Sequence, residues 1–503
     1  MEFLNKRATT KYPDLVTLAE IYQELFSQEE TIPDDDGGGG GGGGGDDKYR
    51  PFFLLLAILF KIQEREETSI KARKGTSVSL AECQGTLEVA GYYWHLQHKL
   101  GKGLREGINN VASSHRDKIL KLMEKNKGKL EAGLGLKICG VSVSELHHGE
   151  MESQVAVAGR KVRPLTAHTP DWVISVQESH RAVLLTVLGT RVFPAPNTGD
   201  VIMDMACRTE AFLDGEAHAG MVLGERNLVK TALPTIIEEL KSRPGFSLLV
   251  VGYSLGAALA QLLLLHLNTE LRPRLPAGLV VRGLLYGIPP VYAGQLTPLE
   301  NVLMLSNHND GITGASLKCL KDVIIKTRAI QNLNLPRRVL VKMALNIDGP
   351  ESELGQEEGD NPEDDKNSVG MVKKKKRAVT TALSQGVHLK KEIMTKTRTT
   401  LTSMVNKRLG TSDEQWVEVE AAVNNVQLCN YPELRFVGER LLVLEKSSSS
   451  EELKVSKITG AEDLRHFTKE VKFKTGMIND HMPWAYNKIF SGKARIILLK
   501  NIW

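Results

Sequence analysis

The sequence predicts an α/β fold with a mostly parallel central sheet, an N-terminal helical region and a disordered insertion. Between residues 160 and 310, short apolar runs bounded by turn residues alternate with stretches of helical apolar spacing. This alternation is typical of buried parallel strands that helices cover on both faces. Hydrophobic residues make up 41% of the 503 residues, which is enough to build a sizeable core.

The N-terminal part divides into two predicted segments. Residues 1–50 form a flexible region that ends in a glycine run, Gly37–Gly45, because such a run buries no side chains and has high backbone entropy. Residues 51–150 are expected to be mainly helical, with Leu, Ile and Ala at helical spacing. Their strongest apolar run, Pro51–Phe60, has about half of the ~20 residues that span a bilayer, so we expect a buried or interfacial helix.

The core of the predicted sheet lies within residues 151–345. The expected strands are Val183–Leu188, Ser247–Val251, Leu279–Tyr286 and Val302–Ser306. Helical spacing is found over Leu223–Lys241 and Leu255–Leu267.

The pattern breaks in residues 346–412, where an acidic stretch precedes the five cations Lys373–Arg377. We predict a solvated, disordered insertion followed by a helix. Alternative roles of the five cations are contact with anionic lipid headgroups and a nuclear-import signal. Residues 413–503 return to the α/β pattern of the predicted sheet. They contain two strand-like runs, Arg435–Leu444 and Leu453–Ile458, around a turn at 447–450, and a late strand at Ala494–Leu499.

Charge and cysteine usage narrow the class of protein. The net charge of +5 is ordinary for a globular chain and gives no case for a nucleic-acid binder. The five cysteines are far apart and fit a reducing compartment better than a disulfide scaffold. The first residues lack the basic head and the apolar stretch of a secretory signal, so we expect none. We therefore expect an intracellular protein, cytoplasmic or peripheral to a membrane.

The most informative stretch is Gly252-Tyr-Ser-Leu-Gly256, in which a glycine stands two residues before and two after Ser254. Four apolar residues lead into it as a strand, and small residues lead out of it as a helix. A serine on such a strand-to-helix turn projects its hydroxyl beyond the sheet, and the flanking glycines avoid collisions. The turn also aims the backbone N–H of Leu255 at the reacting oxygen. This pattern predicts a nucleophile.

The stretch resembles the nucleophile elbow of the class 3 (fungal-type) triacylglycerol lipases, α/β-hydrolases that include the sn-1-specific diacylglycerol lipases. Further motifs follow in the family's order: Leu184–Thr190, Asp200–Asp204, His218–Met221 and Leu285–Val291. The resemblance implies that Thr190 is an oxyanion donor and that Asp204 and His218 brace loops. Two departures stand out, because Tyr253 replaces the usual histidine and Leu188 the usual arginine.

A nucleophilic serine needs a histidine base held by a carboxylate, and in this fold the order along the chain is serine, acid, histidine. Asp310 follows the strand predicted at 302–306, and it also matches the family's acid motif. His481 is the predicted base, because it lies in a loop after the last hairpin and resembles the family's closing Asp-His element. The weaker candidates for the base are His218, His308, His388 and His466.

These residues predict a serine hydrolase that works through an acyl-enzyme. The resemblance implies a lipase that hydrolyses an acyl ester of a glycerolipid, of the di- or triacylglycerol type. No residue cluster argues for a metal or another cofactor. The expected partner is a glycerolipid at a membrane or droplet surface, with peripheral membrane contact and no nucleic acid. Three alternatives stay open: a soluble carboxylesterase, a phospholipase A1-type enzyme, and a catalytically dead lipase-like scaffold.

Overall fold

A computed structural model describes residues 50–69, 76–109, 116–142, 155–157, 160–162, 170–190, 208–295, 297–345, 413–446, 453–468 and 476–490. They fall into two compact units. The sheet unit contains the described residues of 66–325 and 427–490, and the helical unit those of 50–65, 326–345 and 413–426. The boundaries of the five segments expected from the sequence stay a prediction.

The sheet unit is built on a nine-stranded sheet with the order β1-β14-β13-β12-β10-β9-β6-β5-β2. The strands are β1 (Thr76–Val78), β2 (Lys137–Ser142), β5 (Trp172–Gln177), β6 (Ala182–Val187), β9 (Ser247–Tyr253), β10 (Val281–Tyr286), β12 (Leu299–Asn307), β13 (Gly438–Lys446) and β14 (Leu453–Thr459). The five central strands from β6 to β13 are parallel. Antiparallel strands extend the sheet at both edges.

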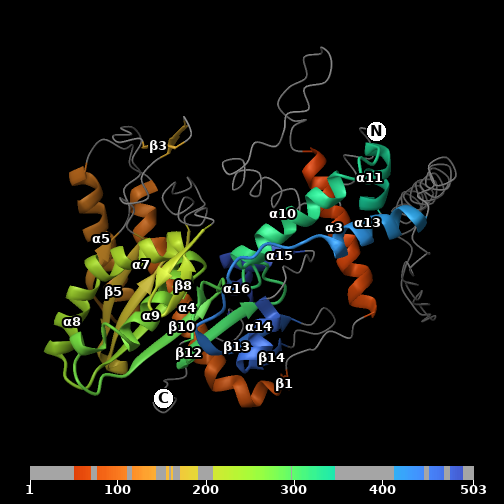
Figure 1. Ribbon diagram of the computed structural model, residues 1–503. Coiled ribbons are helices and arrows are strands. Elements are labelled where there is room, and N and C mark those ends of the chain that lie inside the picture. Colours follow the sequence, from red (N-terminus) through yellow and green to blue (C-terminus); the bar gives the residue numbers. More distant parts are fainter. Residues whose placement is uncertain are drawn as a thin grey trace, which may run out of the picture. The chain divides into compact units, whose positions relative to one another are not determined.

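Helices cover both faces of this sheet, because alternate residues of each strand point to opposite sides. Along β9, Leu248 and Val250 belong to a core shared with α7 (Ala219–Thr231), α8 (Leu233–Ser242) and α9 (Leu255–Asn268). Leu249 and Val251 belong to a second core with α4 (Leu80–Asn109) and α16 (Pro483–Phe490). The labelled α7, α8 and α9 lie together beside the sheet in Figure 1.

Smaller elements complete the described part of the sheet unit. They are η2 (Glu178–His180), η3 (Arg272–Arg274), α5 (Arg116–Leu134), α14 (Ala461–Thr468), α15 (Met477–His481), the hairpin β3 (Val155–Val157) and β4 (Arg160–Val162), and the small sheet β7 (Thr209–Phe212), β8 (Gly215–His218) and β11 (Tyr292–Ala293). Helix α10 (Leu317–Gln331) begins in the sheet unit and ends in the helical unit.

The predicted α/β fold with a mostly parallel sheet is confirmed, with local differences. The predicted helix Leu223–Lys241 is two helices, because Pro234 stands at the start of α8 and cannot continue the ladder of α7. The edge strand β1 lies inside the region expected to be helical. The turn at 447–450, the strand at Ala494–Leu499 and the insertion at 346–377 lie outside the described residues.

The helical unit contains α3 (Arg50–Ser69, whose last residues belong to the sheet unit), α11 (Arg337–Leu345) and α13 (Asp413–Asn425). The apolar run predicted at 51–60 lies on α3, where Leu54–Phe60 are buried. None of the helices in the described ranges combines the length and the apolar character needed to cross a membrane.

Candidate active site

The turn between β9 and α9 holds Ser254 in a strained conformation, with φ +55° and ψ −125°. A non-glycine residue rarely has positive φ, and such strain is typical of a nucleophile elbow. The turn is tight because a Cβ on Gly252 would lie 2.5 Å from the carbonyl oxygen of Gly256. A Cβ on Gly256 would collide with the carbonyl of Val187 at the end of β6. Only glycine fits at both positions.

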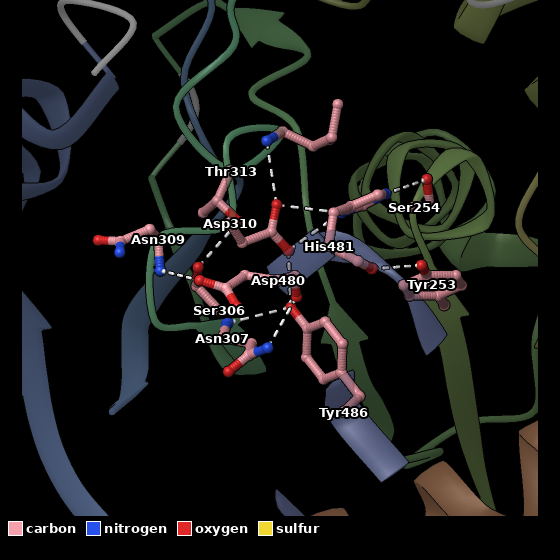
Figure 2. Close-up of polar contacts among 11 residues, drawn as sticks. Tyr253, Ser254, Ser306, Asn307, Asn309, Asp310, Thr313, Asp480, His481 and Tyr486 are labelled. Carbon is pink, nitrogen blue, oxygen red and sulfur yellow. Dashed lines mark hydrogen bonds and ion pairs between the residues drawn. The ribbon is translucent and has the colours of Figure 1, made fainter. Parts of the chain in front are cut away.

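His481 lies between the serine and a carboxylate, as Figure 2 shows. Its Nε2 is 2.8 Å from Ser254 Oγ, and its Nδ1 is 3.0 Å from both carboxylate oxygens of Asp310. An ionised carboxylate only accepts hydrogen bonds, so Nδ1 carries the proton and Nε2 is left to accept the serine hydroxyl proton. The three residues predicted from the sequence are brought together, from positions 227 and 171 residues apart.

The carboxylate of Asp310 is buried and surrounded by donors. The hydroxyl of Tyr486 donates to Oδ2 at 2.9 Å, and the backbone N–H of Ile312 donates to Oδ1 at 3.0 Å. Burial and the charge of Asp310 raise the pKa of Tyr486 well above its ordinary value, so this hydroxyl stays protonated and donates. A buried charge is costly unless it is hydrogen-bonded. These donors, together with His481, therefore satisfy the hydrogen-bonding capacity of the buried carboxylate.

The acid loop after β12 and the short helix α15 are joined by hydrogen bonds to Asp480. Asn307 Nδ2 donates to the carbonyl of Asp480 at 2.7 Å, and the N–H of Asn309 donates to its carboxylate at 3.2 Å. The loop predicted around His481 is this helix, which begins after Gly476 in the left-handed region and ends before Pro483. These hydrogen bonds fix the position of the acid loop relative to the helix that carries the base.

The predicted oxyanion donors lie at the elbow and at the end of the neighbouring strand. Leu255 is the first residue of α9, and the first N–H groups of a helix have no acceptor within the helix. Strand β6 pairs with β9 in parallel, with Val187 opposite Gly252. The segment after β6 runs against the elbow, since a Cβ on Gly189 would lie 2.8 Å from the carbonyl of Tyr253. Thr190 follows directly and is partly buried.

The remaining sequence-predicted residues lie elsewhere. His218 ends β8 and precedes α7, where its backbone N–H donates to the carbonyl of Val291. His308 Nε2 contacts the side-chain amide of Asn309 at 3.2 Å and not Ser254. Asp204 and His388 lie outside the described residues. In the described ranges, no three His, Cys, Asp or Glu side chains are grouped to hold a metal ion.

Two residues next to the triad, Gly287 and Tyr486, were not predicted from the sequence as part of the site. Gly287 has φ +54°, and a Cβ there would lie 2.9 Å from the His481 ring and 3.1 Å from Asp310 Oδ2. Tyr486 donates to Asp310. Both stand inside motifs that carried the family resemblance, and that placement was the available signal. The sequence around Gly287 and Tyr486 does not indicate which residues they contact, because these contacts form only in the folded chain.

A strained serine on a strand-to-helix turn of a parallel sheet, with a histidine and a carboxylate behind it, defines a serine hydrolase of the α/β-hydrolase fold. Residues 187–289, which include the elbow, match the model of the lipase (class 3) family. Over this segment the chain is similar to the class 3 lipases, in keeping with a serine hydrolase that acts on carboxylic esters. A search of the curated proteins finds no significant match.

Solved structures with similarity to the chain are fungal lipases. The lipase of Rhizopus microsporus var. chinensis is 15% identical, with a TM-score of 0.31 over 48% of this chain and 71% of that one. Lipase II from Rhizopus niveus is 17% identical, with a TM-score of 0.32 over 48% and 77%. The Rhizomucor miehei lipase propeptide complex is 13% identical, with a TM-score of 0.31 over 47% and 64%. At these scores, the fold assignment depends on the sheet topology and the elbow.

Proposed function

We propose that this protein is a lipase that hydrolyses an acyl ester of a di- or triacylglycerol-like lipid, with Ser254, His481 and Asp310 as its catalytic triad. The observation that carries the proposal is the 2.8 Å contact between Ser254 Oγ, on the strained elbow, and His481 Nε2. A serine needs such a base because its hydroxyl is a poor nucleophile at neutral pH.

In the proposed reaction, Ser254 Oγ attacks the ester carbonyl carbon while its proton moves to His481 Nε2. The negative oxygen of the tetrahedral intermediate accepts hydrogen bonds from the N–H of Leu255 and from Thr190. The intermediate collapses, and the glycerol oxygen leaves with the proton from His481. Water then attacks the acyl-serine and gives a proton to His481. The fatty acid leaves as that proton returns to Ser254.

Several features support a lipid ester as the substrate. The elbow segment matches the model of a family named for lipases, and the triad geometry argues against a catalytically dead scaffold. Contact with a membrane or droplet surface, and an intracellular location, are part of the proposal. A soluble carboxylesterase is the rival, and it differs because its activity would not rise when the substrate forms droplets.

The test is to incubate the purified full chain with a panel of glycerolipids and to identify the released fatty acids by mass spectrometry. Ser254→Ala should reduce turnover by a factor on the order of 10⁶. Ser247→Ala, at the start of the same strand, is the matched control and should keep the parent activity. Fluorophosphonate labelling of the parent but not of Ser254→Ala is also expected. More than a few per cent activity in a clean Ser254→Ala preparation would refute the mechanism.

A further inference from the structure

The aromatic residue before the nucleophile lies directly over the proposed base. Tyr253 ends β9, and its ring is stacked on the His481 ring with the centroids 5.3 Å apart and 22° between the planes. Its hydroxyl donates to the backbone carbonyl of His481 at 2.5 Å. Figure 2 shows both side chains beside Ser254. One residue thus contacts the base at two points, on its ring and on its backbone.

The position of Tyr253 is itself restricted by packing. Trp94 of α4 meets the Tyr253 ring edge to face, with the centroids 5.2 Å apart and 85° between the planes. Trp94 is buried, stacks on Tyr486 with centroids 4.8 Å apart, and donates from Nε1 to Asn487 Oδ1 at 2.7 Å. Aromatic pairs of these geometries are favourable. The Tyr253 ring is therefore held by Trp94 as well as by its own hydrogen bond.

We propose that Tyr253 is a positioning residue for the reaction: its hydroxyl fixes the backbone of His481, and its ring stabilises the imidazolium that forms when His481 takes the proton of Ser254. This inference depends on the proposed serine hydrolysis. It also explains the tyrosine at position 253, where the class 3 lipases that the sequence resembles usually have histidine.

The second part of the role follows from electrostatics. An aromatic face attracts a cation within about 6 Å, and His481 is a cation only after it accepts the proton. The other titratable groups around His481 are Asp310, Tyr486 and, next in the chain, Asp480. Burial and the charge of Asp310 raise the pKa of Tyr253 well above its ordinary value, so Tyr253 stays neutral and its hydroxyl remains a donor.

Two substitutions separate the two contacts. Tyr253→Phe removes the hydroxyl and keeps the ring, so we expect kcat to fall about tenfold at unchanged KM, with the acid limb of the kcat/KM profile in place. Tyr253→Leu removes both, so kcat should fall further. The acid limb should also move to lower pH, by about half a unit, because the imidazolium loses the aromatic face.

The measurements are hydrolysis of p-nitrophenyl butyrate and the rate of fluorophosphonate labelling of Ser254, both from about pH 5 to about pH 9, with thermal unfolding of each variant. Tyr286→Phe is the matched control, because it also removes a hydroxyl that donates to a backbone carbonyl at 2.5 Å, that of Ala90. It should stay within about twofold of the parent in kcat, since a lost hydrogen bond of this kind affects mainly stability.

Three outcomes would overturn parts of this reasoning. Parent-like kcat in both Tyr253 variants would refute the positioning role. If kcat in the Tyr253 variants fell only as much as in Tyr286→Phe, and the acid limb of Tyr253→Leu did not move, the role of Tyr253 would be structural. That result would also refute the positioning role. A parent chain that neither hydrolyses the ester nor reacts with the fluorophosphonate would overturn the proposed function together with this inference.

Discussion

Gly287→Ala tests whether the histidine and the carboxylate need the space that the structure leaves beside them. Gly287 follows β10 with φ +54°, and its added Cβ would lie 2.9 Å from His481 Cε1 and 3.0 Å from Nδ1. Ordinary contact begins at 3.4 Å. The His481 ring must therefore move by about 0.5 Å, the difference between 3.4 and 2.9 Å.

The expected loss of activity follows from that displacement. A misplacement of about 1 Å at a reacting centre costs roughly 10²-fold in rate, so half of it should lower kcat about tenfold. The alanine also has positive φ, which costs about 1 kcal/mol in a non-glycine residue. For a chain of 503 residues, that strain lowers Tm by only about 1–2 °C.

Gly278→Ala is the control that separates the clash from the strain. Gly278 also has positive φ, +69°, but a Cβ there meets nothing within 4 Å. It should lose similar stability and keep the parent kcat. The assay is kcat for p-nitrophenyl butyrate with Tm by thermal unfolding for both variants. If Gly287→Ala kept the parent kcat, or if Gly278→Ala lost as much, the described packing around His481 would be refuted.

Two further predictions use other histidines. His481→Ala should lose nearly all turnover, whereas His466→Ala on α14 should stay within a few-fold of the parent. The assay is steady-state kinetics with a glycerolipid. The reverse result would contradict the assignment of His481 as the base. His266 Nδ1 bonds buried Glu225 at 2.9 Å, and this hydrogen bond raises the pKa of His266 above its ordinary value of 6.5. Because the folded state favours the proton, the stabilisation is complete below about pH 6.5 and is lost as pH rises through the folded-state pKa. Tm of the parent should therefore fall more than that of His266→Gln, by about 1 °C, when pH is raised from about 6 to about 8. Equal slopes for the two proteins would exclude this role of the ion pair.

The local part of the site could be predicted from the sequence because it depends on neighbouring residues. The apolar run into Gly252-Tyr-Ser-Leu-Gly256 and the small residues after it specify a strand, a tight turn and a helix within about fifteen positions. The parallel strands and the order of serine, acid and histidine follow from similar local patterns and from the family resemblance. The break between α7 and α8 was not predicted, although Pro234 stands at the start of α8.

The contacts that complete the site were decided by the tertiary structure. Tyr253 and His481 are 228 residues apart, and Tyr486 and Asp310 are 176 apart. No pattern along the chain encodes the ring stacking between the first two or the hydrogen bond between the second. The edge strands β1 and β2, and β5 beside β2, were also not predicted, because pairing with a neighbouring strand is a long-range interaction. The sequence by itself determined which chemical groups are available and where the strand-to-helix turn places the nucleophile. The packing of β9, β12 and α15 determined which of these groups are in contact, because side chains distant in sequence meet only when the sheet has formed.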